Sequence, residues 1–392
     1  MWFVALKITD IKTTTVAGNF QWLLVKIETD ERIEGFGETT GENKSIVLSM
    51  KPRLIGEDPT DVKRLWRKMR PSIWSGFNYL QGLTAVETAL LDLTAKSYGI
   101  PVWKFLGGKV RNEVPIYCDC HTGKPIASFK DYAPDPVYST PEAYAENARR
   151  IKNLGLGFKM IKFDYYWPDI TIPGAKQGSA ITDIGAMQCA KTVEAIREVI
   201  GYDMELGLDF GAGGVYVSNA IRFAKAIEEY RLAFVEDLLP PTDVVGWAVV
   251  TSSITTATLT GEVVALVEGF KELIERHAIK IPAPDFQRVG GLMEGQRIAE
   301  LAEDNNLLVA PHCISSPIGE IASVHLCATI PNLIALEWHA VAVPWWENLV
   351  KGIEKPLLKN GCIKVPDKPG LGIELDEQEI RKHLAEGETY FE

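Results

Sequence analysis

The chain has 392 residues, 46% of them hydrophobic and 24% charged, which is typical of a globular protein and argues against disorder. Its 41 basic and 52 acidic residues leave a formal net charge of −11, and we find no basic stripe, so nucleic acid and anionic membranes are poor partners. The length allows two or three domains with a large buried core.

The first part of the chain, residues 1–113, predicts an α+β domain. Polar and apolar residues alternate there first, as in antiparallel strands, and apolar residues then recur at helical spacing. Strands followed by helices indicate a domain distinct from the part of the chain that begins at residue 114. The predicted strands are 8–15, 22–29 and 33–37, and the predicted helices are 45–54, 61–69 and 82–96.

From residue 114 to residue 342, short apolar strands alternate regularly with helices. Eight strands with intervening helices predict a closed parallel barrel of the TIM type. The tail, residues 343–392, is rich in Pro and Gly, lacks this repeat, and is expected to pack back on the first domain. The predicted strands are 114–118, 159–163, 204–209, 232–236, 258–262, 280–284, 307–311 and 333–338. The predicted helices are 141–154, 186–199, 218–230, 244–251, a helix beginning at 269, 292–305 and 319–328.

Two long insertions, 124–140 and 164–185, follow the first two barrel strands. Both would lie at the carboxyl ends of strands, where barrel enzymes carry their active sites. The six cysteines show no Cys-x-x-Cys pair and no pattern of a small disulfide-linked domain, which favours reduced thiols. We find no apolar run of about 18 residues and no signal-peptide pattern, so we expect a cytoplasmic protein with no membrane span.

Three acids each close an apolar strand: Asp209, Glu236 and Glu262. The intervals between them are 27 and 26 residues, about one strand–helix unit of a barrel, which takes roughly 30 residues. Acids at that period lie at the same height on three adjacent strands. Because three converging carboxylates repel one another unless a divalent cation holds them together, the spacing predicts a metal site.

Other strand ends carry further polar residues. Lys162 and Asp164 are two apart and share one strand face, which places a cation beside the predicted metal. Asp285 and His312 end adjacent strands, so the acid can orient the imidazole as a general base. Strand eight adds Glu337 and His339, again on one face; Glu337 could hydrogen-bond a substrate oxygen.

With these features the chain resembles the enolase superfamily, and more closely its mandelate racemase-like subgroup. The resemblance covers essentially the whole length and implies a (β/α)₇β barrel, an α+β capping domain and bound Mg²⁺. It implies Asp209, Glu236 and Glu262 as metal ligands, Asp285 and His312 as the catalytic dyad, and Glu337 as a partner of the enolate oxygens. Besides those residues it is carried by Gly37-Glu38, Thr84–Asp92, Leu106–Lys109, Gly290-Gly291, Pro311-His312 and Pro369–Gly372.

The sequence departs from the subgroup at two positions. Racemase-type members carry a second lysine as a base where this chain has Asp164, and a Lys-Phe-Asp sequence there is similar to some aldonate dehydratases. Many sugar-acid dehydratases carry a histidine just after the first metal ligand, whereas Phe210 follows Asp209 here. If the chain dehydrates its substrate, the acid for the departing hydroxyl comes from elsewhere: His312 acting twice, His339 or Tyr165. Asp285 itself disfavours the muconate cycloisomerase and dipeptide epimerase branches, which have a lysine at that place.

The resemblance also implies that the capping domain sets specificity. By position this concerns the loop 16–22 and the region 74–79, with hydroxyl-binding groups at Asn19, Gln21 and Tyr79 and walls such as Trp22.

The leading hypothesis from the sequence is a Mg²⁺-dependent dehydratase of a sugar acid, an aldonate or aldarate, giving a 2-keto-3-deoxy acid. The alternatives are a racemase or epimerase using Asp164 as an unusual second base, and a non-catalytic protein that binds metal and sugar acids. The expected partner is a small carboxylate substrate, and the resemblance favours a homo-oligomer.

Overall fold

The fold is described from a computed structural model, for residues 6–70, 76–120, 140–165, 172–211 and 216–392. Most of the predicted insertion 124–140, and residues 74 and 75 of the predicted specificity region 74–79, lie outside these ranges. The N-terminal layer, residues 6–112, is called the cap below. Its elements are β1 (Ile8–Ala17), β2 (Gln21–Thr29), β3 (Glu34–Thr40), α1 (Lys44–Leu54), α2 (Val62–Met69), α3 (Phe77–Ser97) and α4 (Val102–Phe105).

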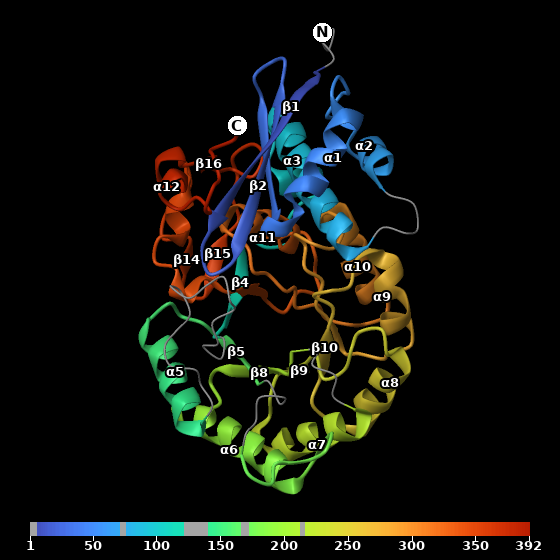
Figure 1. The fold of residues 1–392 in the computed structure, drawn as a ribbon, viewed down its shortest axis with the longest axis vertical. Helices are drawn as coiled ribbons and strands as arrows, with labels where there is room; N and C mark the ends of the chain where they lie inside the picture. The colour runs from blue at the N-terminus through green and yellow to red at the C-terminus, as the bar shows by residue number, and fades with distance from the viewer. Residues whose placement is uncertain (1–5, 71–75, 121–139, 166–171, 212–215) are drawn as a thin grey trace.

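In the cap, an antiparallel sheet in the order β1–β2–β3 packs against the long helix α3 (Figure 1). Glycine makes this packing possible. A Cβ atom on Gly37 would lie 2.0 Å from the Ala85 carbonyl oxygen of α3, which is far inside van der Waals contact, so only glycine lets the strand come this close. The predicted helix over 82–96 begins earlier than expected, at Phe77.

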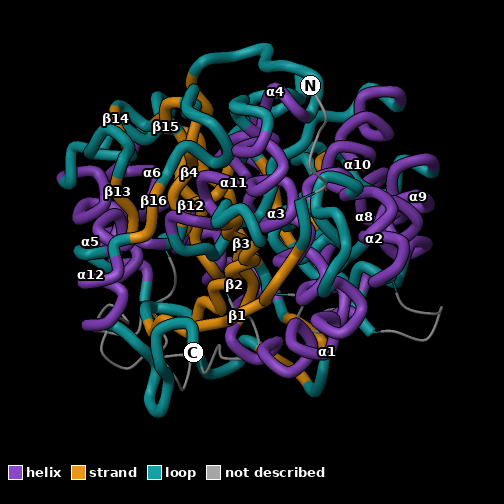
Figure 2. The backbone as a smooth tube through the Cα atoms, turned by 90° about the horizontal axis from the view of Figure 1, so that it is seen from above, coloured by secondary structure: helices purple, strands orange, loops and turns teal. Residues whose placement is uncertain are grey.

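The predicted barrel is confirmed, with helices around a central ring of strands (Figures 1 and 2). Parallel strands follow in the order β11–β10–β9–β8–β5–β4, and β12 pairs with β4 to complete the ring. The strands are β4 (Glu113–Asp119), β5 (Met160–Asp164), β8 (Glu205–Asp209), β9 (Phe234–Glu236), β10 (Thr258–Thr260), β11 (Ile281–Pro282) and β12 (Leu336–Trp338). The helices are α5 (Pro141–Asn153), α6 (Asp183–Ile200), α7 (Val217–Ile227), α8 (Val244–Ser253), α9 (Leu266–Glu275), α10 (Leu292–Asp304) and α11 (Pro317–Cys327).

One predicted strand, 307–311, is not a regular strand. Its backbone fills the place between β11 and β12 through a bridge of Val309 to Leu333 and a hydrogen bond from Ala310 N to the Pro282 carbonyl. The predicted strands 280–284 and 333–338 are likewise shorter than expected. The insertion after β5 contains a small antiparallel hairpin, β6 (Lys176–Gln177) with β7 (Ala180–Ile181).

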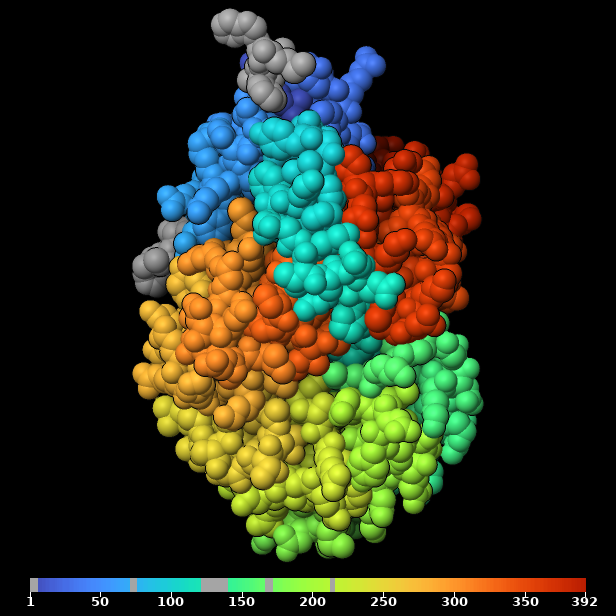
Figure 3. All heavy atoms as spheres, turned by 180° about the vertical axis from the view of Figure 1, so that it is seen from behind, coloured from blue at the N-terminus to red at the C-terminus, as the bar shows by residue number. Residues whose placement is uncertain are grey.

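The tail contacts both parts of the molecule. Its strand β15 pairs antiparallel with β4 at the start of the barrel, while Leu384 bridges to Val16 of the cap. Gly370 bridges to Pro101, and Figure 3 shows the tail in red beside α3 and α4 in cyan. The domain boundaries at 113 and 342 stay a prediction. The tail elements are β13 (Val350–Lys351), β14 (Leu358–Lys359), β15 (Cys362–Lys364), β16 (Glu374–Leu375) and α12 (Glu377–Lys382).

Two buried carboxylates fasten the cap to the barrel. Glu38 accepts hydrogen bonds from the backbone N–H groups of Ser316 (2.8 Å) and Gly319 (2.9 Å) at the start of α11. Glu87 accepts from Leu292 (2.9 Å) and Met293 (3.1 Å) at the start of α10. Burial raises the pKa of Glu38 to about 7 and that of Glu87 to about 8. Helix N-termini favour such acceptors, so the cap is held where it covers the strand ends next to α10 and α11.

Among the described residues, no helix combines the length and the apolarity that crossing a lipid bilayer requires.

Candidate active site

The three acids predicted as a group end neighbouring strands of the barrel. Asp209 closes β8 and lies opposite Glu236, the last residue of β9. Glu262 follows the end of β10 by two residues, and β10 is the next strand in the ring. Parallel strands present their carboxyl ends on one face of a barrel, so all three carboxylates face the same mouth.

Lys162 of β5 lies at the centre of the acidic residues. Its Nζ is 2.8 Å from Glu236 Oε2, 3.5 Å from Asp209 Oδ2 and 2.6 Å from Glu337 Oε1, and only 1% of its side chain is exposed. Burial alone would lower the pKa of this amine, but attraction by Glu236, Glu337, Asp119 and Asp209 raises it well above the usual value. Lys162 is therefore a fixed positive charge inside the barrel.

Asp119 is a site residue that the sequence reasoning missed. It ends β4 beside Lys162, with Oδ2 3.2 Å from the Lys162 Nζ, and it is 1% exposed. The available signal was the same as for the other acids, a carboxylate at the end of an apolar strand. Asp119 escaped notice because the long insertions after β4 and β5 remove the regular period that singles out Asp209, Glu236 and Glu262.

The predicted pair Asp285 and His312 is in contact on the opposite side. His312 Nδ1 lies 2.8 Å from Asp285 Oδ2, and Asp285 also accepts a hydrogen bond from the Gln287 N–H at 2.8 Å. His312 Nε2 faces inward, 2.9 Å from Glu262 Oε2. With one ring nitrogen held by Asp285, the other is directed at the acids, as an acid–base group requires.

Neighbouring charges shift the pKa values of His312 and of Glu262 in opposite directions. Burial disfavours the imidazolium, but attraction by Glu262 and Glu337 and hydrogen bonds with Asp285 and Glu262 raise the pKa of His312 well above its usual value. Burial alone would raise the pKa of Glu262. Attraction by His312 and a hydrogen bond with it outweigh burial and lower the pKa of Glu262 to about 2. Burial and repulsion by neighbouring acids raise the pKa values of Asp209 and Glu236 well above normal.

Glu337 of β12 and His339, the residue directly after that strand, complete the ring. Glu337 Oε1 lies 3.2 Å from His339 Nε2, and Glu337 Oε2 lies 3.8 Å from His312 Nε2. His339 Nε2 is also 3.6 Å from Asp119 Oδ2. In the described part of the chain, a buried cluster of three side chains with ligand-type atoms within 4.8 Å of one another is His312, Glu337 and His339.

Asp164 and Tyr165 lie at the end of β5 but differ in direction. Asp164 is buried and stands opposite Asp209 in the strand register, and its charge contributes to the raised pKa of Asp209 after burial and Lys162 are counted. Tyr165 packs its ring against Phe210 and Phe223, with ring centroids 6.0 and 6.2 Å away. Tyr165 therefore belongs to an aromatic cluster with a helix outside the strand ring.

The cap loop predicted to set specificity reaches the site in part. Asn19 donates its Nδ2–H to the His339 carbonyl at 2.8 Å, and its buried Oδ1 has no hydrogen-bond partner among the described residues. Trp22 donates its indole N–H to the Ile314 carbonyl at 2.8 Å. Gln21 is exposed at the start of β2, and the Tyr79 hydroxyl donates to the Met69 carbonyl within the cap. The roles of all four stay predictions.

The acidic side fits a hard divalent cation. Carboxylate oxygens are the donors that Mg²⁺ prefers, and Asp209, Glu236 and Glu262 offer them from three adjacent strands. Glu236 Oε1 is buried without a hydrogen-bond partner among the described residues, so it is available as a ligand. A buried carboxylate oxygen in that condition is costly unless a cation or a donor meets it.

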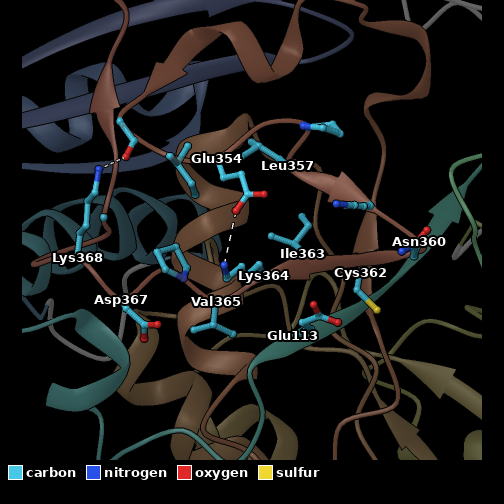
Figure 4. A pocket seen from close by; sticks show the side chains of 16 residues that line it. Glu113, Glu354, Leu357, Asn360, Cys362, Ile363, Lys364, Val365, Asp367 and Lys368 are labelled. Carbon is cyan, nitrogen blue, oxygen red and sulfur yellow. Dashed lines mark hydrogen bonds and ion pairs between the residues drawn. The ribbon is translucent and has the colours of Figure 1, made fainter.

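A separate pocket of about 670 Å³ lies between the tail and the start of β4 (Figure 4). Its lining includes Glu113, the first residue of β4, and the tail residues Glu354 and Lys364, which form an ion pair at 3.5 Å. Asp119 is at the other end of the same strand. The pocket therefore lies at the amino end of the barrel, away from the acids.

Comparisons with known proteins identify the family. Residues 5–107 match the mandelate racemase/muconate lactonizing enzyme N-terminal domain, and residues 143–379 match the enolase C-terminal domain-like family. A D-xylonate dehydratase of Haloferax volcanii is 37% identical over 399 residues, covering 98% of this chain and 91% of that protein.

Solved structures agree. A mandelate racemase/muconate lactonizing enzyme-like protein from Rubrobacter xylanophilus superposes with a TM-score of 0.89 at 34% identity, covering 99% of this chain and 100% of the other. A member of the enolase superfamily from Salmonella Typhimurium gives 0.84 at 27% identity, with 96% and 98% covered. The chain therefore belongs to the mandelate racemase/muconate lactonizing enzyme group of the enolase superfamily.

Proposed function

We propose that this enzyme is a Mg²⁺-dependent dehydratase that removes water from an aldonate to give a 2-keto-3-deoxy acid. The relative named D-xylonate dehydratase supports this reaction class, because it matches the chain over nearly its whole length. A five-carbon aldonate such as D-xylonate is the first substrate to test.

Members of the superfamily use a divalent metal, and here Asp209, Glu236 and Glu262 would hold Mg²⁺. Bound there, the ion would act as a Lewis acid that stabilises negative charge on the substrate carboxylate as the α-proton leaves. Lys162 adds a positive charge that burial and its carboxylate partners keep in place. Such preorganised charge is worth most in a site closed to water.

The proton-abstracting group is His312. The α-proton of a carboxylate is very weakly acidic, so the base must be fixed within hydrogen-bond reach of it. Asp285 holds Nδ1 at 2.8 Å and leaves Nε2 directed toward the acids, which positions this nitrogen. Asp285 also favours the imidazolium that forms once the proton is taken.

Recognition of the sugar chain is assigned to the cap loop. Asn19 is anchored to the His339 carbonyl by its Nδ2, and its unpartnered Oδ1 can accept a hydrogen bond from a substrate hydroxyl. Phe20 lies edge-on to the His339 ring, with centroids 5.5 Å apart, so this loop lies over the carboxyl end of β12.

The observation that carries the proposal is the placement of His312 Nε2 and Lys162 Nζ within reach of one group of carboxylates. The test is to incubate purified protein with Mg²⁺ and a panel of aldonates and aldarates, and to measure semicarbazone-reactive product with and without a chelator. Metal-dependent product from a sugar acid is expected. No turnover across the panel contradicts the dehydratase, and C2 inversion without a keto product would instead favour an epimerase using Asp164.

A further inference from the structure

A second histidine lies in the site without a part in proton abstraction. His339 is 7% exposed, and its Nε2 lies 3.2 Å from Glu337 Oε1 and 3.6 Å from Asp119 Oδ2. Its ring stands 5.8 Å from the ring of His312, centroid to centroid. The site therefore contains two imidazoles side by side. Asp285 holds His312 through Nδ1, whereas Glu337 and, at a longer distance, Asp119 meet His339 through Nε2.

The two imidazoles are close enough to reach the α-hydrogen and the β-hydroxyl of one substrate molecule. A ring nitrogen of His312 and one of His339 lie within 4.8 Å of each other. An α-hydrogen and a β-hydroxyl oxygen on the same side of a sugar acid are about 3 Å apart, and a general acid or base works within about 2.6–3.2 Å of its target. Two nitrogens this close can serve both groups of one substrate molecule at once.

Two other positions at which a general acid for the leaving group was considered do not provide one. Phe210 occupies the position after Asp209, is fully buried, and packs against Phe223 and Tyr165. Tyr165 belongs to that same aromatic cluster, and its hydroxyl interacts with Cys189 and Thr192 of α6 rather than with the acids. Of the candidates that the sequence left open, His312 acting twice and His339 remain.

The backbone of His339 is also held from the cap. Asn19 donates to its carbonyl at 2.8 Å, and Phe20 packs edge-on against its ring. On the barrel side, the carboxylates of Glu337 and Asp119 lie 3.2 and 3.6 Å from its Nε2. The cap and the barrel together fix a proton donor at the wall of the site.

We infer that His339 is the general acid that protonates the departing β-hydroxyl, with Asp119 as its positioning residue. This rests on the proposed function. The C2–H bond breaks and its proton goes to His312 Nε2, and the electron pair forms the C2–C3 double bond. The C3–O bond breaks, and the hydroxyl takes the proton of His339 Nε2 and leaves as water. The enol then tautomerises to the 2-keto acid, and solvent returns both imidazoles to their starting states.

The test compares His339→Asn and His339→Gln with wild type on two substrates: the aldonate, and the same aldonate with fluorine in place of the 3-hydroxyl. Fluoride leaves without needing a proton. Dehydration is expected to fall by about 10²–10⁴-fold in both variants, the usual worth of a general acid. Fluoride release and exchange of the C2 hydrogen with deuterated solvent are expected to stay within about tenfold of wild type.

Two controls separate the possible failures. His312→Asn should lose fluoride release as well as dehydration, because it cannot take the C2 proton. His277→Asn, an exposed histidine at φ +49 where asparagine is well tolerated, should behave as wild type. Asp119→Asn should lower dehydration more than fluoride release, which a purely structural role would not do.

Full dehydration in both His339 variants would overturn the assignment and leave the dehydratase proposal standing, with His312 acting twice. Equal loss of dehydration and fluoride release in folded His339 variants would also overturn it. A wild-type enzyme that dehydrates no sugar acid but exchanges C2 hydrogen would contradict the proposed function instead.

Discussion

Lys162 is the residue on which the charge balance of the site depends. Four buried carboxylates lie within 3.5 Å of its ammonium: Asp119, Asp209, Glu236 and Glu337. The role of Lys162 is therefore not limited to binding the substrate. It also makes the acidic side of the barrel compatible with folding, because unpaired buried charge is strongly destabilising.

Replacing Lys162 by Met should therefore destabilise the protein by about 3–5 kcal/mol, the usual cost of breaking a buried ion pair. Mg²⁺ should restore part of the loss, since ligands that bind the native state stabilise it. Urea unfolding with and without Mg²⁺ measures both effects. Lys364→Met removes an exposed ion pair with Glu354 and serves as the control, with little change expected. A Lys162→Met protein as stable as this control would refute the argument.

His312 should respond to metal through Glu262. Its Nε2 lies 2.9 Å from Glu262, whose attraction helps to raise the pKa of His312 well above 6.5. A cation that shares the charge of Glu262 weakens this attraction, so saturating Mg²⁺ should move the His312 pKa downward and produce the neutral base at lower pH. Proton NMR of the ring hydrogens, assigned by comparison with His312→Asn, measures the shift. An unchanged or raised pKa of His312 would contradict the assignment of Glu262 as a metal ligand.

Much of this residue-level picture follows from the sequence, and the exceptions have physical reasons. Asp209, Glu236 and Glu262 are recognisable because each closes an apolar strand at a constant interval. Asp119 is not, because the insertions after β4 and β5 lengthen the interval between successive strand-end acids to 45 residues (119 to 164 and 164 to 209). The alternation of a strand predicts that Asp164 and its neighbour Tyr165 point to opposite faces, but not that Tyr165 meets Phe210 and Phe223 in an aromatic cluster.

At the scale of elements, barrel strands are predictable in position but not in length. The segment 307–311 and the strand β11 form few ladder hydrogen bonds, because Pro282, Pro284 and Pro311 carry no N–H group. Apolar patterning predicts both segments as strands, and their backbones do take those places in the ring. The apolar pattern of a segment predicts its burial, whereas a regular β-ladder also requires backbone N–H donors.

Helix α11 depends on a carboxylate from another part of the molecule. Glu38 of β3 accepts from Ser316 and Gly319 at its first turn. Glu38→Gln turns one acceptor oxygen into an amide donor facing these N–H groups, and each buried donor left unsatisfied costs about 1–3 kcal/mol. We expect a loss of that size in thermal unfolding, along with reduced turnover because α11 follows His312. Glu42→Gln, on the exposed surface just beyond β3, is the matched control. Equal stability of the two variants would show that Glu38 does not fasten the helix.

At the scale of the whole molecule, one buried histidine joins three segments. His325 of α11 accepts the Trp103 N–H of α4 on Nδ1 at 3.2 Å and contacts the Leu371 carbonyl of the tail through Nε2 at 3.1 Å. These partners require the neutral ring protonated on Nε2. Burial lowers the pKa of His325 from 6.5 to about 4.

This gives a pH dependence of known sign. Because the unfolded chain binds the proton more readily than the folded one, the stabilisation is complete above about pH 6.5 and is lost as the pH falls toward 4, by about 3 kcal/mol at most. His325→Gln keeps a donor for Leu371 but does not titrate, so the stability of wild type relative to this variant should decline over that window. Urea unfolding at several pH values measures the difference. A constant difference would mean that His325 is not held neutral.

The overall architecture is the most predictable level, since the strand–helix repeat and the resemblance both point to a capped barrel, and the structure has one. What the repeat cannot tell is how cap and tail meet the barrel. Those contacts join residues far apart in the chain, such as Asn19 with His339, His325 with Leu371, and strand β15 of the tail with β4.

The central claim is that His312, held by Asp285, removes the proton next to the substrate carboxylate. The most direct measurement is proton NMR of an aldonate substrate with Mg²⁺ in deuterated water, following both the C2 hydrogen and the keto product, for wild type and His312→Asn at equal metal saturation. We predict that in wild type the C2 hydrogen signal disappears as the keto product appears. In His312→Asn the rates of both changes should fall by at least about 10²-fold, as expected for loss of a general base. Loss of the C2 hydrogen at the wild-type rate in His312→Asn would contradict the account.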